Sequence, residues 1–470
     1  MDQEKIKRRQ SLKIIVSEAI MVLTVIITVI ILAFVVSGYW INSDFEIERH
    51  GLLQISSSPT GANIEIDGNS SWLQKTNTSK VLSSGEHTVT ISKDGYDSWS
   101  KKINISEGLL YRIHYPRLFL QDRTAENLYD AAPATFATMS PSHDTLLLVN
   151  ETTKWAVVEL DKEKIEPRFI NVANYFSSVS QVDESGVNIF TGKILSADWD
   201  KDGTHVLFKV ESNGNTEWSL IDVENIASSI NISQEFSSNF DTVKILDNSA
   251  NNLLVVQNGN LRKVDVSGKS ISAILASNVI SFDHFGNEVT FVTKNTAKND
   301  IVNYDVCLMK IGDKDIDTIK TLSTPARVLI SKFYDEQYIT ILVDTTATLY
   351  KKNNLEEIAS FDLSFTPDNL EIGHNGEFVV MYTGGTIATL DMEAMDVLEW
   401  QVDGDKFGWI DDDMIYSVSD GNLIVYDFDG FNRRIIATNV SVHFPAAITE
   451  NKWLYYFSGN SLIREWLIAR

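Results

Sequence analysis

The sequence has little cysteine and little proline. Cys307 is the only cysteine among 470 residues, so an intramolecular disulfide is excluded and packing must stabilise the fold. A single thiol does not indicate whether the protein lies in an oxidising or a reducing compartment. There are eight prolines, and no Pro- or Gly-rich stretch divides the chain after about residue 130, which argues against a string of small domains joined by linkers. With 22 Phe and 10 Trp, the chain can fill a sizeable core.

Positive charge is also scarce. The chain has 40 basic and 64 acidic residues, a net charge of −24, so it repels phosphate backbones and anionic membrane surfaces. This argues against nucleic-acid binding. The N-terminal 18 residues differ, because five lysines and arginines there outnumber three acidic residues.

One stretch has no charge at all. Ala19–Trp40 is 22 residues long, enough for a helix to cross a ~30 Å hydrocarbon core. The basic residues before it predict that residues 1–18 are cytoplasmic and residues 41–470 lie outside, with Tyr39 and Trp40 at the outer interface. A cleaved signal peptide is the alternative, although its apolar core is usually ~7–15 residues and Val35-Val36-Ser37 is a poor cleavage site.

Sequence motifs of catalysis are absent. No G-x-S-x-G, phosphate-binding glycine loop or H-E-x-x-H occurs, and no two of the eight histidines have metal-ligand spacing. His143, His205, His284 and His374 recur around one type of turn, which favours a structural role. We therefore predict no catalytic residue and no cofactor.

One weak metal candidate is Asp198, Asp200 and Asp202. Together with Gly203 they match the first half of a calcium loop, D-x-D-x-D-G. The closing ligand is missing, since Lys209 stands at position twelve. A hairpin turn is the favoured interpretation, and a weak calcium site is the alternative.

Three other features have an ordinary structural interpretation. Cys307 lies in an apolar predicted strand, so we expect its thiol to be buried. Asp411–Asp413 is expected to be a solvated turn, with a cation- or partner-binding rim as the alternative. Four tryptophans near predicted strands favour core packing over a carbohydrate-stacking platform: Trp155, Trp218, Trp400 and Trp409.

The first part of the body alternates apolar and polar residues. Residues 51–55, 62–66, 86–91 and 101–105 have the period of half-buried strands, and glycine-containing turns separate them. They predict a small antiparallel sandwich.

This region resembles the PEGA domain family. The matching residues are Pro59, Gly61, Ala62, Asp67, Gly68, Gly85, Gly95 and Tyr96, and Thr60 stands where the family usually has glutamate. Because position 60 is expected to be an exposed turn residue, the change should leave the fold intact. The resemblance implies a β-sandwich found in surface-exposed or secreted proteins of bacteria and archaea, without catalytic residues and with a structural or adhesive role.

The rest of the chain repeats one unit: an apolar residue, a polar turn and an apolar strand. The interval between repeats averages about 44 residues, close to the ~40–45 of a four-stranded propeller blade. This predicts a WD-like β-propeller of seven or eight blades, with an insertion around 172–192 and a closing strand from residues near 117–129. Tandem sandwiches are the alternative. The repeats begin at Met139, Trp199, Leu246, Phe282, Lys332, Ile372, Trp409 and Ile448.

The prediction is an all-β protein with one N-terminal transmembrane signal-anchor helix. Its parts are a cytoplasmic tail (1–18), the membrane helix (19–40), a PEGA-like sandwich (41–120) and the propeller (121–470). We expect a non-enzymatic binding or scaffold protein of the bacterial cell surface, engaging a protein or envelope glycan, with the PEGA-like module as spacer or wall contact. The alternatives are a propeller-type hydrolase or lyase, or a subunit of an envelope assembly complex.

Overall fold

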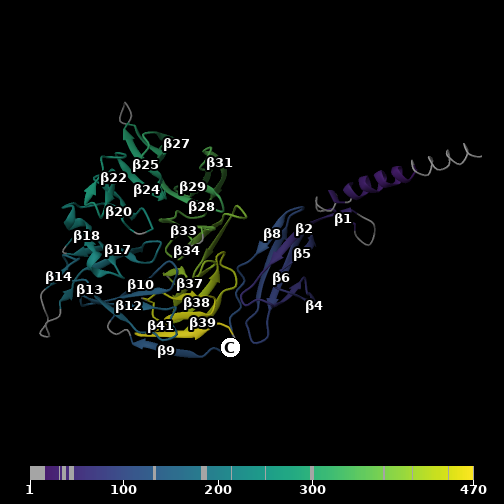
Figure 1. Ribbon diagram of the computed structural model, residues 1–470, viewed down its shortest axis with the longest axis horizontal. Helices are drawn as coiled ribbons and strands as arrows, with labels where there is room; N and C mark the ends of the chain where they lie inside the picture. The colour runs from purple at the N-terminus through teal and green to yellow at the C-terminus, as the bar shows by residue number, and fades with distance from the viewer. Residues whose placement is uncertain are drawn as a thin grey trace, which may run out of the picture. The chain divides into compact units, whose positions relative to one another are not determined.

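The protein has two compact units, Met1–Asp122 and Arg123–Arg470. We describe each by itself, from a computed structural model (Figure 1). The structure describes residues 16–30, 32–33, 39–41, 47–130, 134–180, 188–212, 214–248, 250–296, 301–373, 376–404, 406–442 and 444–468.

The N-terminal apolar stretch is helical over residues 16–30 and 32–33, with exposed side chains. Across the described ranges, no helix combines the length and the apolar character that a membrane span requires. Residues 31 and 34–38 of the predicted span lie outside these ranges. The predicted end of the span needs correction, because Tyr39 and Trp40 belong to a strand, β1 (Tyr39–Ile41), that pairs with β2 (Ile47–Ile55).

The remainder of the first unit is two facing four-stranded sheets. In one, β2 pairs with β1, with β5 (Thr78–Ser83) and with β8 (Leu110–Ile113). We predicted a wholly antiparallel sandwich, and this prediction is wrong for one pair of strands. β8 runs parallel to β2, because the chain crosses the other sheet before returning. The second sheet has the order β4 (Asn69–Lys75), β3 (Asn63–Ile66), β6 (Gly85–Ser92) and β7 (Trp99–Ile105).

The core of the first unit follows from strand alternation. Leu53 and Ile55 of β2, Ile64 of β3, Ile91 of β6 and Trp99 of β7 are fully buried, while the residues between them are polar or partly exposed. Alternate side chains of a strand point to opposite faces, so one face of each sheet packs inward.

The second unit contains, in its described residues, eight four-stranded antiparallel sheets. Seven use consecutive strands, and β9 (Ala125–Asp130) completes the eighth. In chain order the sheets are β10 (Ala134–Met139) to β13 (Arg168–Asn171) with β11 (Thr145–Asn150) and β12 (Lys154–Glu159); β16 (Lys193–Trp199), β17 (His205–Ser212), β18 (Asn215–Asp222), β19 (Ile230–Asn231); β20 (Thr242–Ile245), β21 (Asn252–Gln257), β22 (Asn260–Asp265), β23 (Ser270–Ile271); and β24 (Val279–Phe285), β25 (Glu288–Thr296), β26 (Val302–Lys310), β27 (Ile316–Leu322). They continue as β28 (Arg327–Phe333), β29 (Glu336–Val343), β30 (Thr346–Lys351), β31 (Glu356–Asp362); β32 (Asn369–Ile372), β33 (Phe378–Thr383), β34 (Thr386–Asp391), β35 (Asp396–Gln401); β36 (Phe407–Trp409), β37 (Met414–Ser419), β38 (Asn422–Asp427), β39 (Arg434–Thr438); and β40 (Ala447–Thr449), β41 (Trp453–Ser458), β42 (Ser461–Trp466).

The repeated apolar strand of the sequence is the second strand of each sheet. In β11, β21 and β41 the four central residues are all buried. The sequence of a strand that is covered on both faces is a continuous apolar run, rather than an alternation of apolar and polar residues. Both faces are covered because each sheet packs between two neighbours.

The sheets follow one another in a ring. Val149 of β11 and Phe208 of β17 share one hydrophobic cluster, and comparable clusters join the later sheets. Leu148 of β11 shares a cluster with Tyr455 of β41, which joins the first sheet to the last. The unit therefore has the β-propeller fold.

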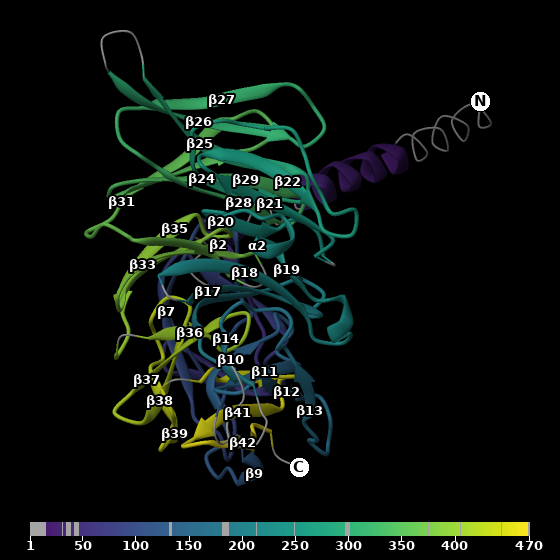
Figure 2. The same ribbon diagram turned by 90° about the vertical axis from the view of Figure 1, so that its left-hand side faces the viewer.

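The prediction that a strand near 117–129 completes the last sheet is confirmed. β9 pairs with β42 in antiparallel register, and Figures 1 and 2 show blue β9 beside the yellow C-terminal strands. Arg464 of β42 is almost fully buried and contacts Glu126 of β9 at 2.8 Å. Arg123 lies 2.8 Å from Glu465. Two ion pairs thus fasten the N-terminal strand to the C-terminal hairpin.

Three short elements interrupt this repeat. The 172–192 region contains a two-stranded sheet, β14 (Val179–Ser180) with β15 (Ile189–Phe190), where an insertion was predicted. A 3-10 turn η1 (Ile226–Ser228) and a short helix α2 (Ile232–Glu235) flank β19.

Candidate ligand-binding site

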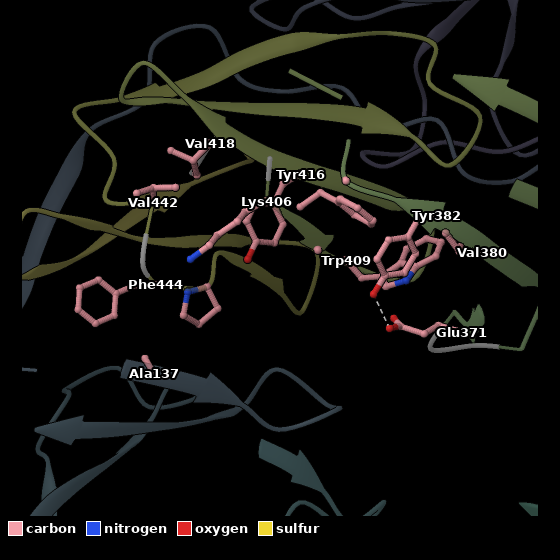
Figure 3. Close-up of a pocket in the computed structure, with 14 residues that line it drawn as sticks. Ala137, Glu371, Val380, Tyr382, Lys406, Trp409, Tyr416, Val418, Val442 and Phe444 are labelled. Carbon is pink, nitrogen blue, oxygen red and sulfur yellow. Dashed lines mark hydrogen bonds between the residues drawn. The ribbon is translucent and has the colours of Figure 1, made fainter. Parts of the chain in front are cut away.

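A hollow of about 500 Å³ opens between the sixth and seventh sheets of the propeller, and Ala137 of the first sheet and residues of the connection between β39 and β40 complete its wall. Figure 3 shows its side chains gathered from strands far apart in the sequence. The lining residues are Ala137, Glu371, Val380, Tyr382, Gly384, Lys406, Phe407, Gly408, Trp409, Tyr416, Val418, Val442, Phe444 and Pro445.

Aromatic rings form much of this wall, and their orientations are fixed by packing. Phe378 of β33 stacks on Trp409 at a centroid distance of 5.9 Å and an angle of 18°. Phe407 meets Tyr382 edge to face, with centroids 4.8 Å apart. Such contacts add to the stabilisation from burial and hold each ring in one position.

Gly408 is required for this geometry. A Cβ built at Gly408 would lie 3.1 Å from the ring of Tyr416, on the adjacent strand β37. A larger residue would therefore displace the ring of Tyr416, which lines the hollow, by a few tenths of an ångström.

The hollow holds a few polar groups among the rings. The Tyr382 hydroxyl donates to Glu371 at 2.5 Å. Burial raises the pKa of Tyr382, and the Glu371 charge raises it further, so the phenol stays a donor. Burial also raises the pKa of Tyr416. Lys406 is exposed to the hollow and forms no ion pair with any residue that the structure describes.

This arrangement suits binding. Flat aromatic faces with a few polar groups at the edge are typical of sites that hold a ring-shaped ligand. Glu371 is the only carboxylate among the described lining residues, whereas glycoside hydrolysis generally uses a pair.

A second hollow of about 480 Å³ lies on the opposite side of β32. Its lysine is already engaged, because Lys244 Nζ lies 2.7 Å from Asp283 Oδ1. Asp283 Oδ2 in turn accepts the backbone N–H of Ile330. The charges of this hollow are thus largely used within the protein.

The calcium-loop candidates lie in the turn between β16 and β17. Asp200 is almost fully buried and accepts the backbone N–H groups of Thr204 and His205 at 2.8 and 2.9 Å. Its other oxygen lies 2.9 Å from both Thr204 Oγ1 and His205 Nδ1. Burial alone raises the pKa of Asp200, but these hydrogen bonds outweigh it and the pKa lies below its ordinary value.

The neighbouring aspartates point elsewhere. Asp198 is exposed and accepts the hydroxyl of Ser196. Asp202 is exposed. The structure thus gives Asp200 a structural role in the hairpin, and the calcium site stays a prediction.

The recurring histidines flank turns at the ends of strands. His205 begins β17, and its Nε2 lies 3.5 Å from Asp222. Burial lowers the pKa of His205, but the hydrogen bond to Asp200 and the charges of Asp222 and Asp200 outweigh it and raise the pKa. His284 ends β24, and burial lowers its pKa. His143 is buried with φ 59°, and His374 lies outside the described residues.

The four tryptophans that were predicted to pack in the core have different environments. Trp155 and Trp218 are buried in clusters between sheets, and their indole N–H groups donate to backbone carbonyls. Trp400 packs at the edge of another cluster. Trp409 alone of the four lines the hollow.

Two other sequence features are explained by local structure. Cys307 is buried, and burial raises the pKa of its thiol. Asp411 accepts the backbone N–H groups of Asp413 and Met414, which orders the turn between β36 and β37.

The sequence analysis missed Lys406, Tyr382 and Tyr416. They carry no motif, and their proximity arises only from the packing of the sixth and seventh sheets. The one available signal was Trp409, next to a glycine.

The motif residues of the first unit form turns rather than a site. Gly61, Gly68 and Gly95 have φ of 74°, 77° and 80°, a conformation that favours glycine. Asp67 accepts the Thr88 N–H at 2.8 Å and lies 2.6 Å from His87 Nδ1. Thr60 is exposed, and its carbonyl accepts Lys93 Nζ. Ala62 is fully buried, Tyr96 nearly so, Gly85 has φ 124°, and Pro59 follows a cis peptide bond.

Comparison with known proteins gives one family match and several distant structural likenesses. Residues 50–116 match the PEGA domain. Among solved structures, the chain is similar to an oligogalacturonate lyase in complex with manganese (11% identity, 74% of this chain and 98% of that one, TM-score 0.40), AztD from Citrobacter koseri (11%, 81% and 96%, 0.39) and the Dos1 propeller (14%, 73% and 95%, 0.44). No curated protein matches the sequence. These likenesses are too distant to assign an activity or a ligand.

Proposed function

We propose that this protein is a membrane-anchored, extracytoplasmic binding protein whose propeller holds a glycan of the cell envelope. The observation that carries the proposal is the hollow beside Trp409. Its walls are aromatic, its polar groups are few, and its rings are fixed by packing. Aromatic faces bind the apolar faces of sugar rings, and edge groups such as Glu371 accept hydroxyl hydrogens.

The proposed position of the propeller outside the cytoplasm supports a ligand from the cell envelope. A PEGA domain at residues 50–116 suggests an extracellular or periplasmic position. The uncharged stretch Ala19–Trp40 follows a basic N-terminus, which favours an anchor with residues 41–470 outside. In this proposal the first unit acts as a spacer or wall contact.

The binding test uses the full chain in detergent on an array of envelope polysaccharides. We expect retention on a subset of glycans and loss of retention in Trp409→Ala. Two results count against a glycan: no retention on any polysaccharide, or capture of a protein partner that Trp409→Ala leaves unchanged. The latter would favour a subunit of an envelope assembly complex.

Activity is tested with the same glycans. We expect no new reducing ends and no unsaturated products after long incubation. Product formation that depends on Glu371 would instead make the protein a propeller-type hydrolase or lyase.

Topology is tested separately. Protease added to intact cells should degrade residues 41–470 and spare residues 1–18. Protection of the propeller in intact cells, with degradation after lysis, would contradict the extracytoplasmic placement.

A further inference from the structure

Lys406 brings an unpaired positive charge into the hollow, although the chain as a whole is strongly acidic. The chain has 64 acidic and 40 basic residues, and several half-buried lysines form ion pairs. Lys244 pairs with Asp283, and Lys352 pairs with Glu288 at 2.9 Å. Within the described chain, Lys406 has no such partner. We propose that Lys406 binds the anionic group of an acidic glycan, an inference that rests on the proposed function of the hollow.

The two charged residues of the hollow occupy different ends of it. Figure 3 shows Lys406 beside Phe444 and Tyr416, and Glu371 beside Tyr382. The Tyr382 hydroxyl holds Glu371 in place, so its carboxylate accepts hydrogens from ligand hydroxyls. An anionic group is repelled at the Glu371 end and attracted at the Lys406 end. The hollow therefore orients an acidic sugar as well as selecting it.

Apolar side chains of the same hollow add contact surface for a sugar ring. Phe444 is almost fully buried, and Pro445 and Val418 add apolar surface. Lys406 itself is exposed, so its attraction for an anion is screened by salt and should weaken as the ionic strength rises. A neutral sugar gains the stacking contacts and the hydrogen bonds to Glu371 but no attraction to Lys406.

The test compares three trisaccharides that differ only at C6. They are cellotriose, the β-1,4-linked glucuronic acid trimer and 6-O-sulfated cellotriose. Binding to the full chain in detergent is measured by isothermal titration calorimetry at low and high salt. We expect the acidic trimers to bind about tenfold more tightly than cellotriose at low salt, with the preference shrinking as salt rises. The tighter of the two acidic trimers identifies carboxylate or sulfate as the source of the charge.

Three variants make the test specific. Lys406→Gln should reduce the acidic preference to less than about twofold, and Lys406→Arg should keep it, because the charge remains. Lys310→Gln is the matched control, since Lys310 is exposed at the end of β26 and outside the hollow. It should change nothing.

The outcomes separate the two proposals. If all three trimers bind alike, or if Lys406→Gln keeps the preference, the acidic-glycan inference is wrong while glycan binding stands. If none of the three binds, the acidic-glycan inference is wrong, and the proposed function fails as well only when the polysaccharide array also shows no retention.

Discussion

The propeller places charged and polar groups in two kinds of surroundings, the hairpin turns and the hollow. In the turn after β16, the Asp200 carboxylate accepts hydrogen bonds from Thr204 and His205 and has no capacity left for a ligand. In the hollow, Lys406 has no partner among the described residues, and Glu371 is engaged by one phenol. Polar groups that the protein leaves available beside fixed aromatic rings can bind a ligand, whereas groups that are engaged by their own turn stabilise the fold.

The largest expected effect is on stability, from Asp200→Ala. The substitution removes a buried carboxylate that accepts several hydrogen bonds and leaves their donors unpaired, so we expect a loss of about 3 kcal/mol in the free energy of unfolding. Urea unfolding followed by circular dichroism measures it. Asp202→Ala, an exposed residue of the same turn, is the control and should change little. Equal effects from both substitutions would show that the buried Asp200 carboxylate is no more important to this turn than the exposed Asp202.

Trp409→Ala should act on binding instead. Loss of a stacking face in the hollow is expected to weaken glycan affinity by about 30-fold, or roughly 2 kcal/mol. Calorimetric titration of the glycan retained on the array measures it. Trp409→Phe keeps a ring and should recover most of the affinity. A Trp409→Ala protein that binds normally would place the ligand elsewhere.

His205 gives the turn a pH dependence. The raised pKa of His205 means that its contribution is fully present below the ordinary histidine pKa and is lost as pH rises through the raised value. Asp200 has a lowered pKa, so its contribution is lost as pH falls through that value. We expect wild type to exceed His205→Gln in stability by about 1 kcal/mol near pH 6 and by less near pH 9. A constant difference would show that the pair is not charged.

Tyr382→Phe should have a smaller effect. It removes the hydroxyl that positions Glu371 and keeps the ring, so we expect glycan affinity to fall about twofold to threefold. The melting temperature should be unchanged. A loss as large as that of Trp409→Ala would make Glu371 the main determinant of binding.

Calcium should have the smallest effect. Since Asp200 is occupied by its own turn, neither added calcium nor a chelator should shift the melting temperature. A rise with calcium that Asp198→Asn abolishes would instead establish the site that D-x-D-x-D-G suggested.

The sequence predicted the architecture well because the repeat is local. A polar turn followed by a strand buried on both faces leaves the same pattern in each blade, as at Thr145–Asn150 and Trp453–Ser458. The blade number was left at seven or eight because intervals vary, and an insertion such as β14 with β15 lengthens one of them. The parallel pairing of β8 with β2 was missed because it joins strands more than 50 residues apart.

The hollow could not be predicted in the same way. Ala137, Glu371 and Phe444 become neighbours only when the ring of sheets closes. The conspicuous motif, Asp198 to Gly203, turned out to build a hairpin. A carboxylate that hydrogen-bonds its own turn leaves the same letters in a sequence as one that binds an ion, and only geometry separates them.

The most direct test of the account is to map the bound ligand. A glucuronic acid trimer carrying a photoreactive diazirine is bound to the full chain, irradiated, and the labelled peptides are identified by mass spectrometry. We expect labels on the peptides that contain Lys406–Trp409 and Phe444–Pro445, and competition by unlabelled trimer. Labels concentrated on the turn around Asp198–His205, or on the first unit, would contradict the claim that the aromatic hollow is the binding site.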